Sequence, residues 1–88
     1  MNDQCLKPAS HVLTQEAGSE LVLFNTKTDS SLYLNETAAL IWQNLDGIRT
    51  VADVVATIQA NYPNESVADD ILDVMRSLQS SGFVEPSK

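Results

Sequence analysis

Few residues in this 88-residue chain are of the types that carry out chemistry. Its one histidine, His11, lacks the partners that a catalytic triad or a histidine–carboxylate metal site requires. Its one cysteine, Cys5, cannot form an internal disulfide bond. We therefore expect His11 to be an ordinary surface or half-buried residue and Cys5 to be a bystander near the N-terminus.

A group of carboxylates, Asp69, Asp70 and Asp73, is the nearest approach to a metal site, since Asp69 and Asp73 lie one helical turn apart. Calcium prefers six or more oxygen ligands, normally supplied by a shaped loop. Acidic residues also favour helix N-termini, and Asp73 can pair with Arg76 three residues later. With no glycine-rich phosphate loop and no CxxC motif, the sequence predicts no catalytic residues, no cofactor and no metal.

The charge and hydropathy of the chain exclude two further classes of protein. The net charge is −7, with five basic residues that do not cluster, which counts against binding to phosphate-rich nucleic acid. No run approaches the roughly 20 apolar residues that span a membrane. The opening MNDQCLKPAS lacks the apolar core of a signal peptide, so we expect a cytoplasmic protein.

The first half of the chain has the pattern of short strands. Residues 10–15 form a weak candidate, residues 20–25 a clear one, and residues 31–34 a third. Turn-forming residues separate them, which predicts a three-stranded antiparallel meander. The strand at 20–25 has apolar side chains on both faces, so both faces could be covered.

The second half has the pattern of three helices. The first is expected at residues 36–45, capped by Asn35 and stopped by Gly47. The second begins after Thr50, whose spacing to Asp53 suggests a capping box, and ends near Pro63.

The third helix is expected to begin after Ser66, again with Asp69 at the third position, and to end near residue 81, where Gly82 stops it. Residues 9–85 are therefore expected to form one domain. Residues 1–8 are expected to be a flexible N-terminal tail and residues 86–88 a C-terminal tail.

The third helix carries two apolar stripes. One consists of Val67, Ile71, Val74 and Leu78 and should face the core. The other, rotated by about 100°, consists of Ala68, Leu72, Met75 and Gln79. Either both stripes form one wide core face, or Leu72 and Met75 line an open groove, for which adaptable methionine is well suited.

A series of short motifs runs through the chain: Leu23-Phe24-Asn25, Tyr33-Leu34-Asn35-Glu36-Thr37-Ala38-Ala39, Ile41-Trp42, Leu45-Asp46-Gly47, Arg49-Thr50-Val51, Leu78 and Gly82-Phe83-Val84. These motifs resemble the PqqD family, small proteins that recognise the precursors of ribosomally made, post-translationally modified peptides. The resemblance covers residues 11–85. Its most specific part is LNETAALIW followed by LDG-x-RTV, whereas the C-terminal helix matches only as a hydrophobic pattern.

The resemblance implies an α+β, winged-helix-like fold, in which a three-stranded antiparallel sheet is followed by three helices. It also implies a function without catalysis. Family members bind the leader segment of a precursor peptide as an added strand and present the peptide to a modifying enzyme, often a radical SAM enzyme. The pathway could be synthesis of pyrroloquinoline quinone (PQQ) or of a lasso peptide or sactipeptide.

The peptide-binding residues implied by the resemblance lie on two elements. On the third strand they are Ser30, Ser31, Leu32, Tyr33 and Leu34, and on the third helix they are Ala68, Leu72, Met75, Arg76 and Gln79. Which face of the strand packs inward is left open. Arg76 could meet an acidic leader residue or simply pair with Asp73.

Two other kinds of protein also fit a pattern of strands followed by three helices. A winged-helix DNA-binding protein would need a basic recognition helix, but residues 51–61 contain no Lys or Arg. The other is a structural subunit of a modification complex, without its own peptide groove. Because an exposed edge strand can also pair with itself, the expected state is a monomer or a weak, strand-swapped dimer.

Overall fold

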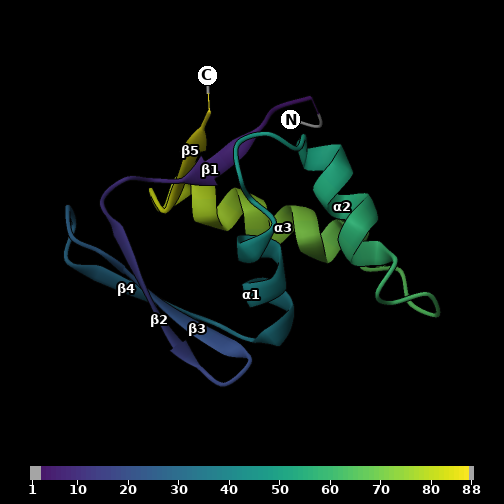
Figure 1. Ribbon diagram of the computed structural model, residues 1–88, viewed down its shortest axis with the longest axis horizontal. Coiled ribbons are helices and arrows are strands. Elements are labelled where there is room, and N and C mark those ends of the chain that lie inside the picture. Colours follow the sequence, from purple (N-terminus) through teal and green to yellow (C-terminus); the bar gives the residue numbers. More distant parts are fainter. Residues whose placement is uncertain (1–2, 88) are drawn as a thin grey trace.

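The computed structural model describes residues 3–87, so Met1, Asn2 and Lys88, at the ends of the two predicted tails, lie outside the described residues. The described residues form four strands, then three helices, then a last short strand, and Figure 1 shows how these elements are arranged. In chain order the elements are β1 (Leu6–Pro8), β2 (Val12–Ala17), β3 (Glu20–Asn25), β4 (Ser30–Leu34), α1 (Glu36–Gln43), α2 (Val51–Gln59), α3 (Ala68–Ser80) and β5 (Val84–Pro86).

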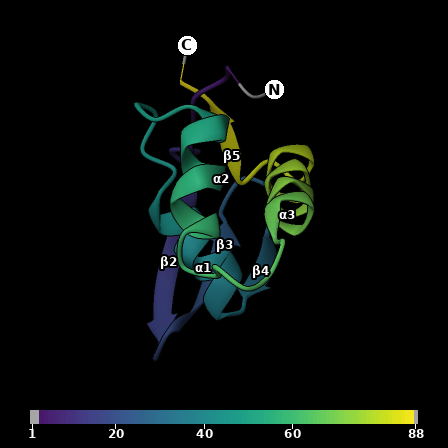
Figure 2. The same cartoon turned by 90° about the vertical axis from the view of Figure 1, so that its right-hand side faces the viewer.

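Strands β2, β3 and β4 form the expected antiparallel meander, with β3 in the centre. Burial alternates along β3, where Leu21 and Leu23 are buried and Val22 and Phe24 are each 38% exposed. The helices lie on the side of the sheet that carries the buried residues, where α1 contacts β3 and β4 and α2 packs against α1 and α3 (Figures 1 and 2). The α+β prediction is confirmed, whereas cover on both faces of β3 is wrong, because within residues 3–87 no helix or strand packs over Val22 and Phe24.

The predicted N-terminal tail is wrong for residues 6–8, which form β1 and pair with β5 in a second, two-stranded antiparallel sheet. Leu6 is 1% exposed and belongs to the hydrophobic core. Its carbonyl accepts a hydrogen bond from the N–H of Gly47 at 2.9 Å, and the Ser87 N–H donates to Cys5 O at 2.9 Å. The two ends of the described chain therefore hold each other, which local sequence patterns do not reveal.

Two predicted helix caps are confirmed. The side chain of Asn35 accepts from the N–H of Ala38 at 2.9 Å, and Thr50 and Asp53 form a complete capping box at the start of α2. Gly47, expected to stop α1, instead lies in the loop four residues beyond Gln43, with φ +79° and close to Lys7. Its positive φ and small volume allow this loop to approach β1.

The start of α3 differs from expectation, because its N-cap is Val67 and makes no side-chain capping bond. The loop before it is held by Gln59, whose amide oxygen accepts from the Val67 N–H at 3.0 Å and whose amide nitrogen donates to Tyr62 O at 3.0 Å. At the other end, the N–H groups of Gly82 and Phe83 donate to Gln79 O and Leu78 O, which is a Schellman motif. None of the helices within residues 3–87 is both long enough and apolar enough to cross a membrane.

Candidate functional site

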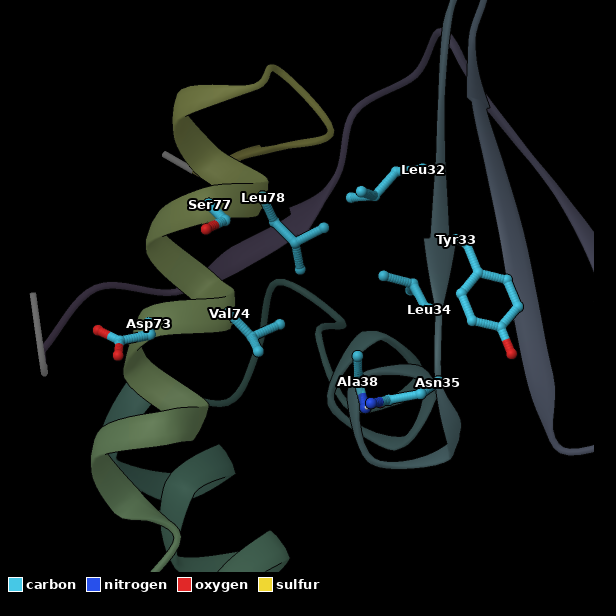
Figure 3. A pocket seen from close by; sticks show the side chains of 9 residues that line it. All are labelled: Leu32, Tyr33, Leu34, Asn35, Ala38, Asp73, Val74, Ser77 and Leu78. Atoms are coloured by element: carbon cyan, nitrogen blue, oxygen red, sulfur yellow. The ribbon is translucent and has the colours of Figure 1, made fainter.

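A pocket of about 350 Å³ lies between β4 and α3. Figure 3 shows α3 on one side, β4 on the other, and the start of α1 between them. The residues that line it are Leu32, Tyr33, Leu34, Asn35, Ala38, Asp73, Val74, Ser77 and Leu78. Most of these side chains are aliphatic, and the polar ones come from the outer side of α3 and from the cap of α1. We call this space the β4–α3 groove.

The strand wall of the groove shows which face of β4 packs inward. Leu32 and Leu34 point toward α3, whereas Tyr33 points to the opposite face of the sheet and is 58% exposed. Hydrogen bonding to the Glu20 carboxylate raises the pKa of the Tyr33 phenol. The inward leucines therefore supply apolar surface to the groove.

The outer edge of β4 carries backbone groups with no strand partner. β4 ends the order β2-β3-β4, and within residues 3–87 it pairs only with β3. Alternate residues of an edge strand direct their N–H and C=O groups away from the sheet. This edge lies along the open side of the groove, so an extended chain placed there could bond to it.

The helix wall is formed by a face of α3 other than the one expected. Val74 and Leu78 point toward β4, whereas the carboxylate of Asp73 points away from the strand at the outer rim of the groove (Figure 3). Ser77 also lines this side of the groove. Val74, predicted to be in the core, is half-buried because it reaches the groove. This orientation of α3 follows from the burial of Ile71, Met75 and Leu78 in the core.

The predicted helix residues are not brought to the groove. Met75 is 0% exposed and belongs to the core, so its prediction as a groove-lining side chain is wrong. Leu72 packs against that core, and Ala68 and Gln79 are half-buried without lining the β4–α3 groove. Arg76 is exposed and lies 3.2 Å from Asp73, as the simpler interpretation expected. Neighbouring positions on a helix differ by about 100°, so a shift of one residue changes the face completely.

Asn25 connects two segments next to the groove through its side chain, a role that was not predicted from the sequence. It is fully buried at the end of β3; its side-chain nitrogen donates to Gly82 O at 3.2 Å, and its oxygen accepts from Lys27 N at 2.9 Å. It thus ties the β3–β4 turn to the C-terminal end of α3. The sequence feature that could have indicated this role is the position of Asn25 in the Leu23-Phe24-Asn25 motif.

The groove offers apolar side chains and free backbone groups as surfaces for binding. Among the side chains of residues 3–87, no three His, Cys, Asp or Glu residues are grouped in a way that could hold a metal ion. His11 is half-buried on the short segment before β2, and its carbonyl accepts from Thr26. Free backbone groups beside apolar side chains suit an extended polypeptide.

Three comparisons bear on what this geometry is used for. The family model described as coenzyme PQQ synthesis protein D (PqqD) matches residues 20–84. A protein of Stutzerimonas stutzeri (strain A1501) named PqqA binding protein is 42% identical over 45 residues, which is 50% of this chain and 49% of that protein. The matched segment thus spans about half the length of that relative.

Two solved structures share the fold. One is described as TbiB1 in complex with the TbiA(beta) leader peptide, and it aligns with a TM-score of 0.79 and 25% identity, covering 90% of this chain and 94% of that one. The other, lasso peptide synthetase B1 complexed with the leader peptide, has a TM-score of 0.77 and 26% identity over 93% of this chain and 99% of that one. Both neighbours were solved with a leader peptide bound.

Proposed function

This chain belongs to the PqqD family, and on that premise we propose that it is a non-catalytic module that binds the leader segment of a ribosomally made precursor peptide and delivers the peptide to a modifying enzyme. The observation that carries the proposal is the free edge of β4 beside an apolar groove closed by α3. The relatives support it, because one is named for binding PqqA and two were solved with leader peptides.

Binding follows from the physics of an edge strand. The leader adds as a fourth strand along Ser30–Leu34, and its backbone satisfies the free N–H and C=O groups of β4. Alternate side chains of an extended peptide point to one side, so every second leader residue enters the groove between Leu32, Leu34 and Val74. Backbone bonds supply affinity that depends little on sequence, and the groove supplies selectivity.

The expected affinity is moderate. A short added strand buries less than the roughly 1,600 Å² of a standard protein interface, and part of the gain is offset by ordering a flexible peptide. We expect dissociation constants in the micromolar to sub-micromolar range, about −8 to −10 kcal/mol. Such complexes dissociate fast enough to pass the peptide on to an enzyme.

The modifying enzyme, a radical SAM enzyme in one version of the proposal, supplies the chemistry in the cytoplasm. The small module contributes recognition. The precursor peptide that this chain binds would identify the biosynthetic pathway in which it acts.

The test is an amide NMR titration of the whole chain with three kinds of peptide: PqqA, the TbiA(beta) leader and the precursor peptides encoded beside this gene. We expect saturable shifts along Ser30–Leu34 and at Val74 and Ser77, with little change in β2. Shifts confined to other surfaces, or no binding by any of these peptides, would contradict the proposal and favour a structural subunit.

A matched pair of variants places the peptide in the groove. Ser77 and Ser80 are both exposed on α3, but only Ser77 lines the groove. Ser77→Trp should fill the space beside β4 and weaken binding at least tenfold, whereas Ser80→Trp should leave it within about twofold. Circular dichroism checks that both variants fold, and equal affinities for the two would place the peptide elsewhere.

A further inference from the structure

The β4–α3 groove does not end at the last residue of β4. A second pocket of about 320 Å³ adjoins it, and both are lined by Asn35, Ala38 and Val74. The second pocket lies between the start of α1, the loop after α2 and the start of α3. Its further lining residues are Thr37, Ile41, Tyr62, Glu65, Val67, Asp70 and Ile71.

This second pocket combines an apolar floor with an acidic rim. Ile41, Val67 and Ile71 are buried beneath it, whereas Glu65 and Asp70 are exposed at its edge. The Tyr62 and Thr37 hydroxyls hydrogen-bond to each other at 3.0 Å across one side. None of the described residues that line either pocket is basic.

That combination matches the side chain of Lys or Arg. Both residues lay an aliphatic stem along apolar surface while the charged end stays near water or a carboxylate. Among the lining residues of the first pocket, the one carboxylate is that of Asp73, and it is already paired with Arg76 at 3.2 Å. Glu65 and Asp70 form no ion pair among the described residues, so their charge is available to a ligand.

The direction of the added strand decides which part of a leader reaches this pocket. The chain leaves β4 at Leu34 and passes Asn35, which lines both pockets. An antiparallel strand pairs slightly better than a parallel one, and antiparallel addition brings the N-terminal end of the peptide strand beside Leu34. Each extended residue advances about 3.3 Å, so the few residues before the strand segment lie over the second pocket.

We propose that the pocket bounded by Tyr62, Glu65 and Asp70 binds a Lys or Arg side chain of the leader, located within about three residues before its strand-forming segment. The proposal rests on the proposed function and adds to it a charge preference and a direction. It makes the acidic start of α3 a determinant of which leaders this protein accepts.

The probe is the tightest binder among PqqA, the TbiA(beta) leader and the neighbouring precursor peptides. Each of the three residues before its strand segment is replaced in turn by Lys and by Glu. At one of these positions, the Lys peptide should bind about three- to tenfold more tightly than the Glu peptide at low salt, and the difference should shrink as salt rises.

The protein side of the test has a matched control. Asp69 and Asp70 are adjacent exposed acids in the first turn of α3, but only Asp70 lines the pocket. Asp70→Asn combined with Glu65→Gln should remove most of the Lys-over-Glu preference, whereas Asp69→Asn should retain it. A spin label at the peptide N-terminus should broaden the amide signals of Tyr62 and Asp70 more than those of Thr28 and Ser30.

The outcomes separate this inference from the function on which it rests. If peptides shift β4 and Val74 but the Lys and Glu forms bind equally, the basic-residue pocket is overturned and the function stands. If the spin label broadens the amide signals of Thr28 and Ser30 instead, the peptide strand runs parallel to β4. The proposal of a basic-residue pocket is then overturned, and the function again stands. If no peptide binds, both proposals fail together.

Discussion

Met75 lies at the middle of α3 with no exposed surface, among buried side chains from the sheet and the other helices. A carboxylate at this position would be desolvated without a partner, and deleting the methionine would also leave a cavity. Small domains are only marginally stable. Met75→Asp is therefore expected to unfold the protein, with a loss of more than about 4 kcal/mol.

The measurement is urea unfolding followed by circular dichroism. Ser80→Asp serves as the control, because Ser80 is exposed on the same helix, and it should change stability by less than about 0.5 kcal/mol. A folded Met75→Asp variant with weakened peptide binding would contradict the buried position and return Met75 to the groove.

At the scale of elements, the largest difference from the sequence-based expectation is the pairing of β1 with β5, because residues 1–8 were expected to form a flexible tail. β1 contributes Leu6 to the core and accepts a hydrogen bond from Gly47, and β5 follows directly on α3. Since α3 forms one wall of the groove, loosening this small sheet should also disturb the groove.

Deleting residues 1–8 is accordingly expected to destabilise the protein by about 2–4 kcal/mol, since a fully buried leucine and a strand pairing are lost. Deleting residues 1–3 should have little effect, because the carbonyl of Gln4 that accepts from Val51 at 2.8 Å is kept. Thermal unfolding of the two truncated chains measures the difference, and equal melting temperatures would show that β1 contributes nothing.

At the scale of the whole molecule, the helices cover one face of the β2–β3–β4 sheet and leave the other bare. The bare face carries Leu13, Val22, Phe24 and Tyr33, and the sheet also has two open edges. These features favour self-association, whereas the net charge of −7 opposes it, because two copies of the chain repel each other.

We therefore expect a monomer at low protein concentration and a minor dimer at high concentration, increasing with salt as the repulsion is screened. If the dimer pairs through the β4 edge, a bound leader peptide should abolish it, because both use the same backbone groups. Sedimentation velocity with and without peptide distinguishes the cases. A dimer unaffected by peptide would use the β2 edge or the bare face instead.

Local sequence by itself determined the features that depend on neighbouring residues. The meander, the Asn35 cap, the Thr50–Asp53 capping box and the Gly82 stop follow from short-range hydrogen bonding and glycine geometry. The motifs around them were enough to indicate the family, and with it the strand at Ser30–Leu34 as one side of the groove.

The tertiary structure decided the features that depend on how distant segments pack. Periodicity places Val74 and Met75 on faces about 100° apart but does not say which face meets the core. Burial of Ile71, Met75 and Leu78 fixes that rotation. The β1–β5 pairing joins segments nearly 80 residues apart, and the second pocket combines residues of α1, of α3 and of the loop between α2 and α3. Such juxtapositions arise from the shared burial of one core, and no local pattern encodes them.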